Sequence, residues 1–235
     1  MPASARGLAR LACAFTALAP ARALDNGVGR TPARGWLSWE RFACTVDCAA
    51  APNGCISERL YMEMADAMVA GGWRDAGYEY VDVDDCWLAR ARDASGRLAA
   101  DPERFPSGIR ALADYVHARG LKLGLYTDVG ATTCEGYPAL DVPVSGEADV
   151  PSVGASRGYA ADLALLASWG IDPLKVDGCN QPTDHYAVTY PRVSRALNAT
   201  GRAVLLSCSW PAYMQARART AATRREAPAP LPAAT

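Results

Sequence analysis

Two short stretches of the chain place acidic side chains where a strand is expected to end. The first, residues 174–179, reads LKVDGC, so a short apolar run leads to Asp177 and then to a glycine. Lys175 lies two residues before Asp177 and therefore on the same face of an extended strand. A carboxylate that is kept ionised beside a cation can serve as a nucleophile. The pattern predicts that Asp177 sits at the open end of a strand, with an ordinary turn or helix-capping aspartate as the alternative.

The second stretch, residues 78–87, reads YEYVDVDDCW. This β-prone run ends in Asp84 and Asp85, and Trp87 follows closely. Carboxylates that accept hydrogen bonds from hydroxyl groups, beside an aromatic ring, describe a sugar-binding pocket. Acidic strand ends also describe a site for a divalent metal ion, and composition does not separate the two. The sequence therefore predicts a polar rim to which two strand ends contribute.

The composition fits one folded domain without a strongly charged surface. The chain has 235 residues, a formal net charge of −1 and 50% hydrophobic residues, which is enough to bury one sizeable core. This balance of charge argues against a nucleic-acid ligand. His117 is expected in a helix and His185 in a loop, both at the surface, so neither a metal site nor a cofactor is predicted.

Residues 1–23 have the pattern of a secretory signal peptide. Two arginines precede a small apolar run over 11–19, and residues 21–23 have the small-x-small form of a cleavage site. The apolar run is too short to span a bilayer. We expect the leader to be removed, with a mature start near Leu24; a disordered, alanine-rich leader is the alternative.

Export would decide how the cysteines are interpreted. Seven remain after the leader: Cys44, Cys48, Cys55, Cys86, Cys134, Cys179 and Cys208. In an oxidising compartment these are disulfide partners before they are zinc ligands, whereas the first three would suggest a metal site in the cytosol. An odd number leaves Cys208 or another thiol unpaired, or means that its partner is missing. The glycosylation sequon Asn198-Ala199-Thr200 agrees with export.

The spacing of apolar residues predicts strands that alternate with helices. Strands are expected over 36–39, 78–85, 121–128, 174–177 and 204–210. Helices are expected after Ser57, after Ser107, over 159–169 and from Pro191. Their inward-facing residues are expected to be Leu60, Met64, Ala67, Met68, Ile109, Leu112, Ala113, Val116, Leu163, Leu166, Val193 and Leu197. This alternation indicates parallel strands joined by right-handed crossovers. Acids at the strand ends, without a glycine-rich phosphate loop after the first strand, favour a (β/α)8 barrel over a dinucleotide-binding sheet.

The number of expected strands is too small for a whole barrel. A (β/α)8 barrel needs eight strands and about 250 residues, and the five strand signals all precede residue 211. Residues 215–235 carry no apolar period and are expected to form a disordered tail rich in Ala, Arg and Pro. Residues 140–157 have a similar composition and are predicted to be an insertion. The expected domain is thus a partial barrel over 24–214.

Five segments together resemble a known enzyme family. They read LDNGVGRTPARGWLSWERFACTVDC, GWRDAGYEYVDVDDCW, DPERFPSGIRALADYVHARGLKLGLYTDVG, LKVDGC and SCSWPAY. These long, collinear motifs are similar to the lysosomal α-galactosidase and α-N-acetylgalactosaminidase family, glycoside hydrolase family 27, from Leu24 to about Tyr213 apart from the insertion. The resemblance implies a retaining glycosidase that removes terminal α-linked galactose or N-acetylgalactosamine from glycoconjugates. It also implies a lysosomal or secreted protein, and a homodimer.

The resemblance implies roles for individual residues. Asp177, in LKVDGC, matches the nucleophile. The residues that match sugar-contacting positions are Trp39, Asp84, Asp85, Tyr126, Lys175 and Tyr213. In SCSWPAY, Ser209 and Ala212 resemble the form of the family that leaves room for an N-acetyl group, because they open a volume that a Glu and a Leu would fill. Ordinary packing at a strand end is the alternative for these two small residues.

The cysteines also fall where the family has them. The resemblance pairs Cys44 with Cys86, Cys48 with Cys55, and Cys134 with Cys179. It pairs Cys208 with a downstream cysteine that this chain lacks, which would account for the odd count.

Departures from the family bear on activity. A retaining glycosidase needs two carboxylates about 5 Å apart, and the family's acid/base lies on the strand after SCSWPAY, beyond the point where this chain diverges. The family's C-terminal β-sandwich is also missing, and Arg34 stands where the family has an apolar Met. We therefore expect a truncated form with little catalysis and doubtful dimerisation. A non-catalytic sugar-binding fragment and an unfolded product are the alternatives.

Overall fold

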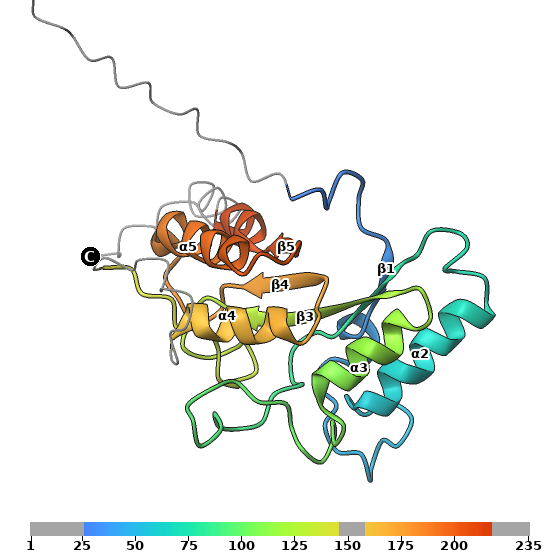
Figure 1. Cartoon of the computed structure of the whole chain (residues 1–235). Coiled ribbons are helices and arrows are strands. Elements are labelled where there is room, and N and C mark those ends of the chain that lie inside the picture. Colours follow the sequence, from blue (N-terminus) through green and yellow to red (C-terminus); the bar gives the residue numbers. More distant parts are fainter. Residues whose placement is uncertain (1–25, 146–157, 218–235) are drawn as a thin grey trace, which may run out of the picture.

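The chain folds into one parallel sheet whose strands follow one another in sequence. The computed structural model describes residues 26–145 and 158–217. The strands are β1 Gly35–Leu37, β2 Tyr80–Asp82, β3 Lys122–Asp128, β4 Pro173–Asp177 and β5 Leu205–Cys208. They pair in the order β1-β2-β3-β4-β5, and every pair is parallel (Figure 1). The predicted α/β class and the strand order of a (β/α)8 barrel are confirmed.

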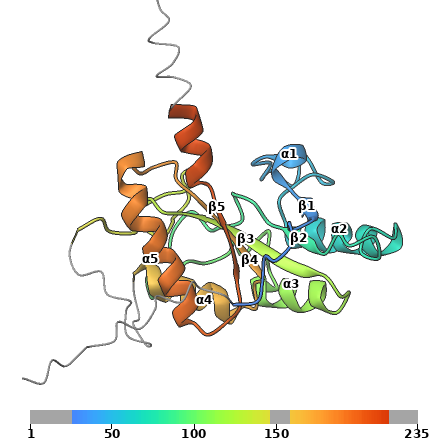
Figure 2. The ribbon, with the colours of Figure 1, turned by 90° about the horizontal axis from the view of Figure 1, so that it is seen from above.

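Helical segments connect the strands. They are α1 Trp39–Phe42, α2 Glu58–Ala70, α3 Gly108–His117, α4 Tyr159–Ser168, the 3-10 turn η1 Thr183–His185 and α5 Tyr186–Ala199. A further helix runs over 210–217, directly after β5. Figure 2 shows the same elements from above. In the described ranges the barrel is partial, since nothing pairs with the outer edges of β1 and β5, and none of these helices is long and apolar enough to cross a membrane.

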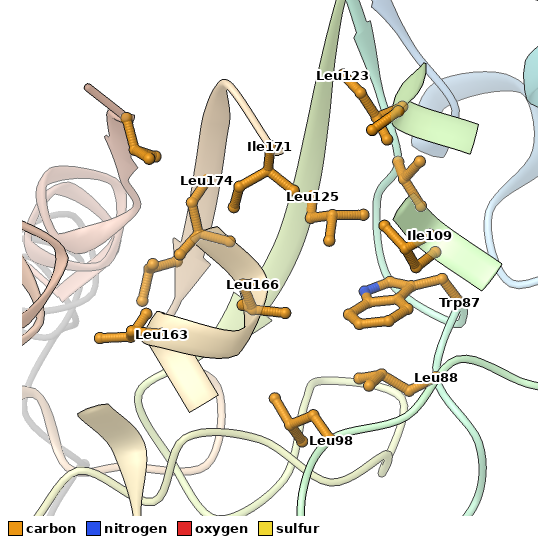
Figure 3. Packing of buried hydrophobic residues seen from close by; sticks show 14 of the residues in the cluster. Trp87, Leu88, Leu98, Ile109, Leu123, Leu125, Leu163, Leu166, Ile171 and Leu174 are labelled. Atoms are coloured by element: carbon orange, nitrogen blue, oxygen red, sulfur yellow. The ribbon is translucent and has the colours of Figure 1, made fainter. Parts of the chain in front are cut away.

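The two faces of the sheet differ because side chains alternate along each strand. One face meets the helices and is apolar; it carries Val81, Leu123, Leu125, Leu174 and Val176, all of them buried. Figure 3 shows how Leu123, Leu125 and Leu174 of this face pack against side chains of α3 and α4, with Trp87, Leu88 and Leu98 from the loop after β2. The opposite face, called here the inner face, carries Asp82, Tyr126, Lys175 and Asp177. The sheet therefore separates the core from the polar side chains.

The predicted inward residues of three helices are confirmed, and those of α2 are partly wrong. The expected residues of α3, α4 and α5 are all buried. In α2, Leu60 and Met68 are buried and Met64 is half-buried, but Ala67 is exposed, and Tyr61 and Ala65 are buried instead. At about 100° per residue, Ala67 lies roughly 100° away from the centre of the stripe that Tyr61 and Met68 define. The true stripe is rotated toward Tyr61.

Several predicted boundaries are wrong at strand and helix ends. β1 ends at Leu37, so Trp39 begins α1 instead of ending a strand, and β2 ends at Asp82, before Asp84. α5 begins at Tyr186, directly after η1, and Pro191 lies inside it. Proline is tolerated there at the cost of one backbone hydrogen bond, because its nitrogen has no proton for the carbonyl one turn earlier.

The first residues assigned to the predicted insertion belong to the fold. Leu140 and Val142 are buried in the core, and their backbone N–H groups donate to the carbonyls of Asp128 and Val129. This segment is thus part of the fold, because its apolar side chains close the core below the loop after β3. Residues 215–217, assigned to the tail, are helical. The leader, residues 146–157 and the tail beyond 217 lie outside the described residues.

A polar cluster ties the strands together at their amino ends. The Asp172 carboxylate accepts hydrogen bonds from the Leu123 backbone N–H and from the Arg202 guanidinium. His117 Nε2 lies 2.7 Å from the same carboxylate. His117 is therefore a half-buried partner of Asp172 and not a free surface residue, whereas His185 lies in η1. In barrels this end serves stability, and the chemistry lies at the other end.

Truncating a residue of the apolar face should destabilise the protein more than the same change on the inner face. Leu123→Ala removes a fully buried side chain and should lower the free energy of unfolding by about 2–5 kcal/mol. Leu37 pairs in register with Asp82 and therefore lies on the inner face, and it is 36% exposed. Leu37→Ala is the matched control and should cost less than about 1 kcal/mol. Urea unfolding followed by circular dichroism measures both. Equal losses would contradict the assignment of the two faces.

Candidate active site

The candidate site residues gather at the carboxyl ends of the strands. Asp177 is the last residue of β4 and pairs in register with Asp128, the last residue of β3; one layer earlier, Lys175 pairs with Tyr126. Asp84 follows the end of β2 by two residues. Because parallel strands end on the same side of a sheet, residues far apart in sequence meet here. The structure thus brings the predicted acids together on one rim.

Asp177 is surrounded by hydrogen-bond donors. Its Oδ2 accepts from the Tyr126 hydroxyl at 3.2 Å, and its Oδ1 accepts from the Tyr213 hydroxyl at 2.8 Å and from the Gly178 backbone N–H at 3.0 Å. Cys134 Sγ lies 3.6 Å from Oδ2. The side chain is half-exposed. These contacts fix the orientation of the carboxylate while leaving one side open to solvent.

The hydroxyl groups of Tyr126 and Tyr213 act as stable hydrogen-bond donors. Burial, together with nearby carboxylates that include Asp177, raises the pKa of Tyr126 and of Tyr213 well above the ordinary tyrosine value. The ring of Tyr213, from the helix over 210–217, also packs edge-on against Tyr186 at 5.6 Å between centroids. Both hydroxyls therefore stay protonated at any physiological pH and keep donating to Asp177.

Lys175 forms an ion pair with Asp84. Its Nζ lies 2.7 Å from Asp84 Oδ2, and the Asp84 side chain is 2% exposed. The ammonium also lies 4.9 Å from the centroid of the Tyr126 ring. The interpretation that Lys175 neutralises Asp177 directly is therefore wrong, because the long lysine side chain reaches across β3 to the buried acid. The ammonium of Lys175 is linked to Asp177 through Tyr126, since it lies over the Tyr126 ring and the Tyr126 hydroxyl donates to Asp177.

Two further acids hold the loops of the rim. Asp85 accepts from the Cys86 N–H at 2.6 Å and from the Glu135 N–H at 3.1 Å. Asp128 accepts from the N–H groups of Gly130 at 2.7 Å and Cys179 at 2.8 Å. Both side chains are buried. Each carboxylate thus joins backbone segments from different loops, and both of its oxygens are engaged by backbone donors.

Burial changes the acidity of these two carboxyl groups. Burial raises the pKa of Asp85, against the hydrogen bonds from Cys86 and Glu135. Burial also raises the pKa of Asp128 to about 6, although hydrogen bonds from Gly130 and Cys179 oppose it. Asp128 is the last residue of the strand expected over 121–128, and Gly130, two residues later, is the sequence signal of a side chain that caps a turn.

Disulfides reinforce the same loops. The bridges are Cys44–Cys86, Cys48–Cys55 and Cys134–Cys179, the pairs that the resemblance implies. The first joins the segment after β1 to the segment after β2, and the third joins the segments after β3 and β4. Cys208, at the end of β5, is unpaired and exposed. Covalent links thus connect successive loops around the rim.

The remaining sequence-predicted residues lie at the edge of this group. Trp39 is half-exposed at the start of α1, just beyond β1. Ser209 follows β5, and its N–H donates to the Val176 carbonyl. Ala212 is exposed on the helix over 210–217, next to Tyr213. These residues border the rim, whereas the side-chain hydrogen bonds to Asp177 come from Tyr126 and Tyr213.

A metal ion does not fit the acids of the rim. Asp128, Cys134, Asp177 and Cys179 have ligand-type atoms close together, but the two sulfurs are joined in a disulfide. Asp128 uses both oxygens on backbone N–H groups. A disulfide sulfur is a poor ligand compared with a thiolate. Among the described residues this cluster therefore favours the sugar-pocket interpretation over the metal one.

Comparison with known proteins places the chain in a family. The sequence profile described as alpha galactosidase A matches residues 31–226. The chain belongs to this family. Human alpha-galactosidase A is 53% identical over 195 residues, 83% of this chain and 42% of that protein. Chicken alpha-N-acetylgalactosaminidase is 53% identical over 190 residues, 81% of this chain and 44% of that protein.

Solved structures of the alpha galactosidase A family agree with the fold. Alpha-galactosidase I from Mortierella vinacea has a TM-score of 0.64 at 35% identity, over 78% of this chain and 42% of that chain. Alpha-galactosidase from Saccharomyces cerevisiae, solved with raffinose, has a TM-score of 0.64 at 33% identity, over 78% of this chain and 36% of that chain. The chain thus spans less than half the length of these relatives.

Asp82 is a further acid that sequence reasoning missed. It lies on the inner face, one layer below Asp84, and its side chain covers Gly124 of β3. Burial raises the pKa of Asp82 to about 7, and the charge of Asp84 adds to the rise, whereas Lys175 opposes it. The alternation in 81–85, where every second residue is an aspartate, is the signal that could have placed Asp82 beside Asp84.

The raised pKa values predict that the protein is more stable in mild acid than at neutral pH. The pKa is about 7 for Asp82 and about 6 for Asp128 in the folded chain, against about 3.9 when unfolded. Between these values the folded state binds more protons, so the free energy of unfolding should fall as the pH rises from about 4 to about 7. Urea unfolding at pH 5 and pH 7.5 measures this.

A substitution separates the part due to Asp82. Asp82→Asn removes the titrating group, so the loss of stability between pH 5 and pH 7.5 should become smaller. Asp114→Asn, at an exposed position of α3, is the control and should leave the loss unchanged. Greater stability at pH 7.5 in the wild-type protein, or the same pH dependence in Asp82→Asn, would contradict the assignment.

Proposed function

We propose that this chain carries the nucleophile and the sugar-binding half of a retaining glycosidase site for terminal α-linked N-acetylgalactosamine or galactose. The observation that carries the proposal is the setting of Asp177, a half-exposed carboxylate at the end of β4 that three donors orient. A carboxylate that attacks an anomeric carbon must be ionised, oriented and open to the substrate. Membership of the alpha galactosidase A family supports this role.

The neighbours of Asp177 supply contacts for a sugar ring. Asp84 and Lys175 offer an acceptor and a donor for hydroxyl groups, and their ion pair keeps both in place. The rings of Tyr126 and Trp39 are suited to the apolar face of a sugar. Asp85 was expected to bind hydroxyl groups as well. Both acids are buried and have a donor on each oxygen, but one donor to Asp84 is the partly exposed ammonium of Lys175, whereas backbone N–H groups donate to both oxygens of Asp85. We therefore propose that Asp84 and Lys175 together bind the sugar and that Asp85 shapes the pocket.

Small side chains after β5 favour N-acetylgalactosamine. Ser209 and Ala212 lie within four residues of Tyr213 in the sequence, and the Tyr213 hydroxyl donates to Asp177. A bulky or acidic pair at these positions would fill the space beside the substituent at C2 of the sugar. We therefore propose that the pocket accepts the N-acetyl group.

In this proposal, protonation of the leaving group is the weak step for the part of the chain that the structure describes. Asp85 and Asp128 are buried acids of the rim, and backbone N–H groups donate to both oxygens of each. These hydrogen bonds hold the two carboxyl groups to the loops, so we assign neither of them to the acid/base role. We propose that the chain cleaves sugars with good leaving groups and leaves natural glycoconjugates bound but intact, as a sugar-binding fragment would.

The leader and the three disulfides support a place in the secretory pathway, either lysosomal or secreted. The exposed Asn198 in its sequon is accessible for glycosylation.

A covalent trap should label Asp177. With 5-fluoro-α-D-galactosyl fluoride, a carboxylate oxygen forms an ester with the anomeric carbon and fluoride leaves without needing a proton, so the step does not depend on an acid/base. Peptide mass spectrometry should find the sugar on the peptide that contains Asp177. Asp177→Asn should abolish the label, and Asp184→Asn, an exposed acid in η1, should retain it.

The same preparation tests the leaving-group requirement. A 2,4-dinitrophenyl α-N-acetylgalactosaminide should be cleaved measurably, whereas an alkyl α-N-acetylgalactosaminide should not. Labelling of another residue, or none at all, would overturn the nucleophile assignment. Comparable rates for the two substrates would contradict the proposal that leaving-group protonation is the weak step.

Enlarging the two small residues should change the sugar preference. Ser209→Glu combined with Ala212→Leu should weaken binding of N-acetylgalactosamine relative to galactose by about tenfold or more, because the acetyl group loses its space. NMR titration with the two free sugars measures the ratio of dissociation constants. Ala187→Leu, at an exposed position of α5, is the control. An unchanged ratio would show that these residues do not line the pocket.

A further inference from the structure

A buried chain of hydroxyl groups runs from the helix layer to the sugar-binding acid. The Tyr61 hydroxyl, on α2, donates to Ser38 Oγ at 3.1 Å. Ser38, just after β1, accepts a second hydrogen bond from the backbone N–H of Asp84 at 3.2 Å. Ser38 and Tyr61 are 0% exposed and Asp84 is 2% exposed. The three groups thus form a continuous polar path inside an apolar surrounding.

The position of the Tyr61 hydroxyl is fixed by ring packing. The ring lies edge-on to Trp36 at 5.8 Å and stacks with Phe105 at 6.2 Å between centroids. Burial raises the pKa of Tyr61 far above the ordinary value, so the hydroxyl keeps its proton. The packed ring of Tyr61 therefore holds its hydroxyl within hydrogen-bonding distance of Ser38 Oγ.

Ser38 links the Tyr61 hydroxyl to the backbone at the end of β2. Its own backbone N–H donates to the carbonyl of Asp82. Ser38 is therefore hydrogen-bonded to the backbone on both sides of Val83, at Asp82 and at Asp84. Its Oγ has two acceptor lone pairs, and Tyr61 and Asp84 occupy them. Without the Tyr61 donor, one acceptor position of this buried oxygen is left unsatisfied, and we expect Ser38 and the Asp84 amide bonded to it to shift.

The Asp84 side chain depends on that backbone position. Its Oδ1 accepts from the Asp85 N–H at 2.9 Å, and its Oδ2 holds Lys175 at 2.7 Å. Lys175 lies over the ring of Tyr126, whose hydroxyl donates to Asp177. The hydroxyl path therefore ends on the groups that bind the sugar and orient the nucleophile.

We infer that Tyr61 and Ser38 are positioning residues that set the affinity of the pocket for sugar by fixing the backbone of Asp84. The inference rests on the proposed function, because it assigns Asp84 to the sugar. Tyr61 touches no substrate itself. A merely structural role would lower the stability of the protein but would leave the affinity of the folded fraction unchanged.

Two substitutions and a matched control test this role. Tyr61→Phe removes one hydroxyl and keeps the ring, and Ser38→Ala removes the acceptor. Tyr115→Phe makes the same chemical change where the hydroxyl donates to Asp66 Oδ2 at 2.9 Å, between α3 and α2. D-galactose and N-acetylgalactosamine are titrated into each folded variant, with affinity followed by calorimetry and the Asp84 amide proton by NMR.

Tyr61→Phe should weaken sugar binding by about threefold to tenfold, the range expected for one lost buried hydrogen bond, and should shift the Asp84 amide resonance. The Tyr61→Phe, Ser38→Ala double variant should bind no more weakly than Ser38→Ala alone, because the two act in one path. Tyr115→Phe should match the wild type in both readouts.

Unchanged affinity and an unshifted Asp84 amide in Tyr61→Phe would overturn the inference while leaving the proposed function intact. A shifted amide with unchanged affinity would also overturn it, since the path would then reach Asp84 without reaching the sugar. Failure of the wild-type protein to bind either sugar would instead overturn the proposed function, and the inference with it.

Discussion

The ion pair between Asp84 and Lys175 is the interaction around which the inner face is arranged. It spans from the end of β2 to β4 over the intervening β3, and its acid is nearly inaccessible to water. A buried carboxylate needs a partner of opposite charge, since removal of the partner would leave an uncompensated charge. The Lys175 ammonium pairs with Asp84, and Asp82 lies one layer below this pair. Asp82 therefore accommodates burial by binding a proton, with its pKa raised to about 7.

The acids of the rim divide into structural and chemical groups. Asp85 and Asp128 hold loops together by accepting backbone N–H groups, and disulfides link the same loops covalently. Asp177 is oriented mainly by phenols and stays half-exposed. The number of acids at the strand ends is thus larger than the number available to a substrate. Which acids remain available depends on how many backbone donors reach each of them.

Tyrosine hydroxyls act on two of these acids, Asp177 and Asp84. Tyr126 and Tyr213 donate to Asp177, and Tyr61 acts on Asp84 through Ser38. Burial raises the pKa of all three phenols, so they donate without adding charge. Neutral donors orient a carboxylate and leave it anionic. A second ammonium could orient it as well, but another ion would then have to be buried. The site therefore uses one cation and several hydroxyl groups.

The sequence by itself determined the fold class, the order of the strands and the positions of the acids at their ends. These follow from local patterns, since apolar periodicity and strand-end polarity depend on neighbours in sequence. The buried faces of α3, α4 and α5 could be predicted for the same reason. The family motifs added the cysteine pairs, which spacing alone left open.

Only the tertiary structure decided which acid pairs with which group. Lys175 shares a strand face with Asp177 but reaches Asp84, because cross-strand distances are shorter than the reach of a lysine. Tyr61 faces the core where Ala67 was expected, since the stripe of α2 is set by what packs against it. Partner choice and burial depend on contacts between residues distant in sequence, and those contacts are made only when the strands and helices assemble.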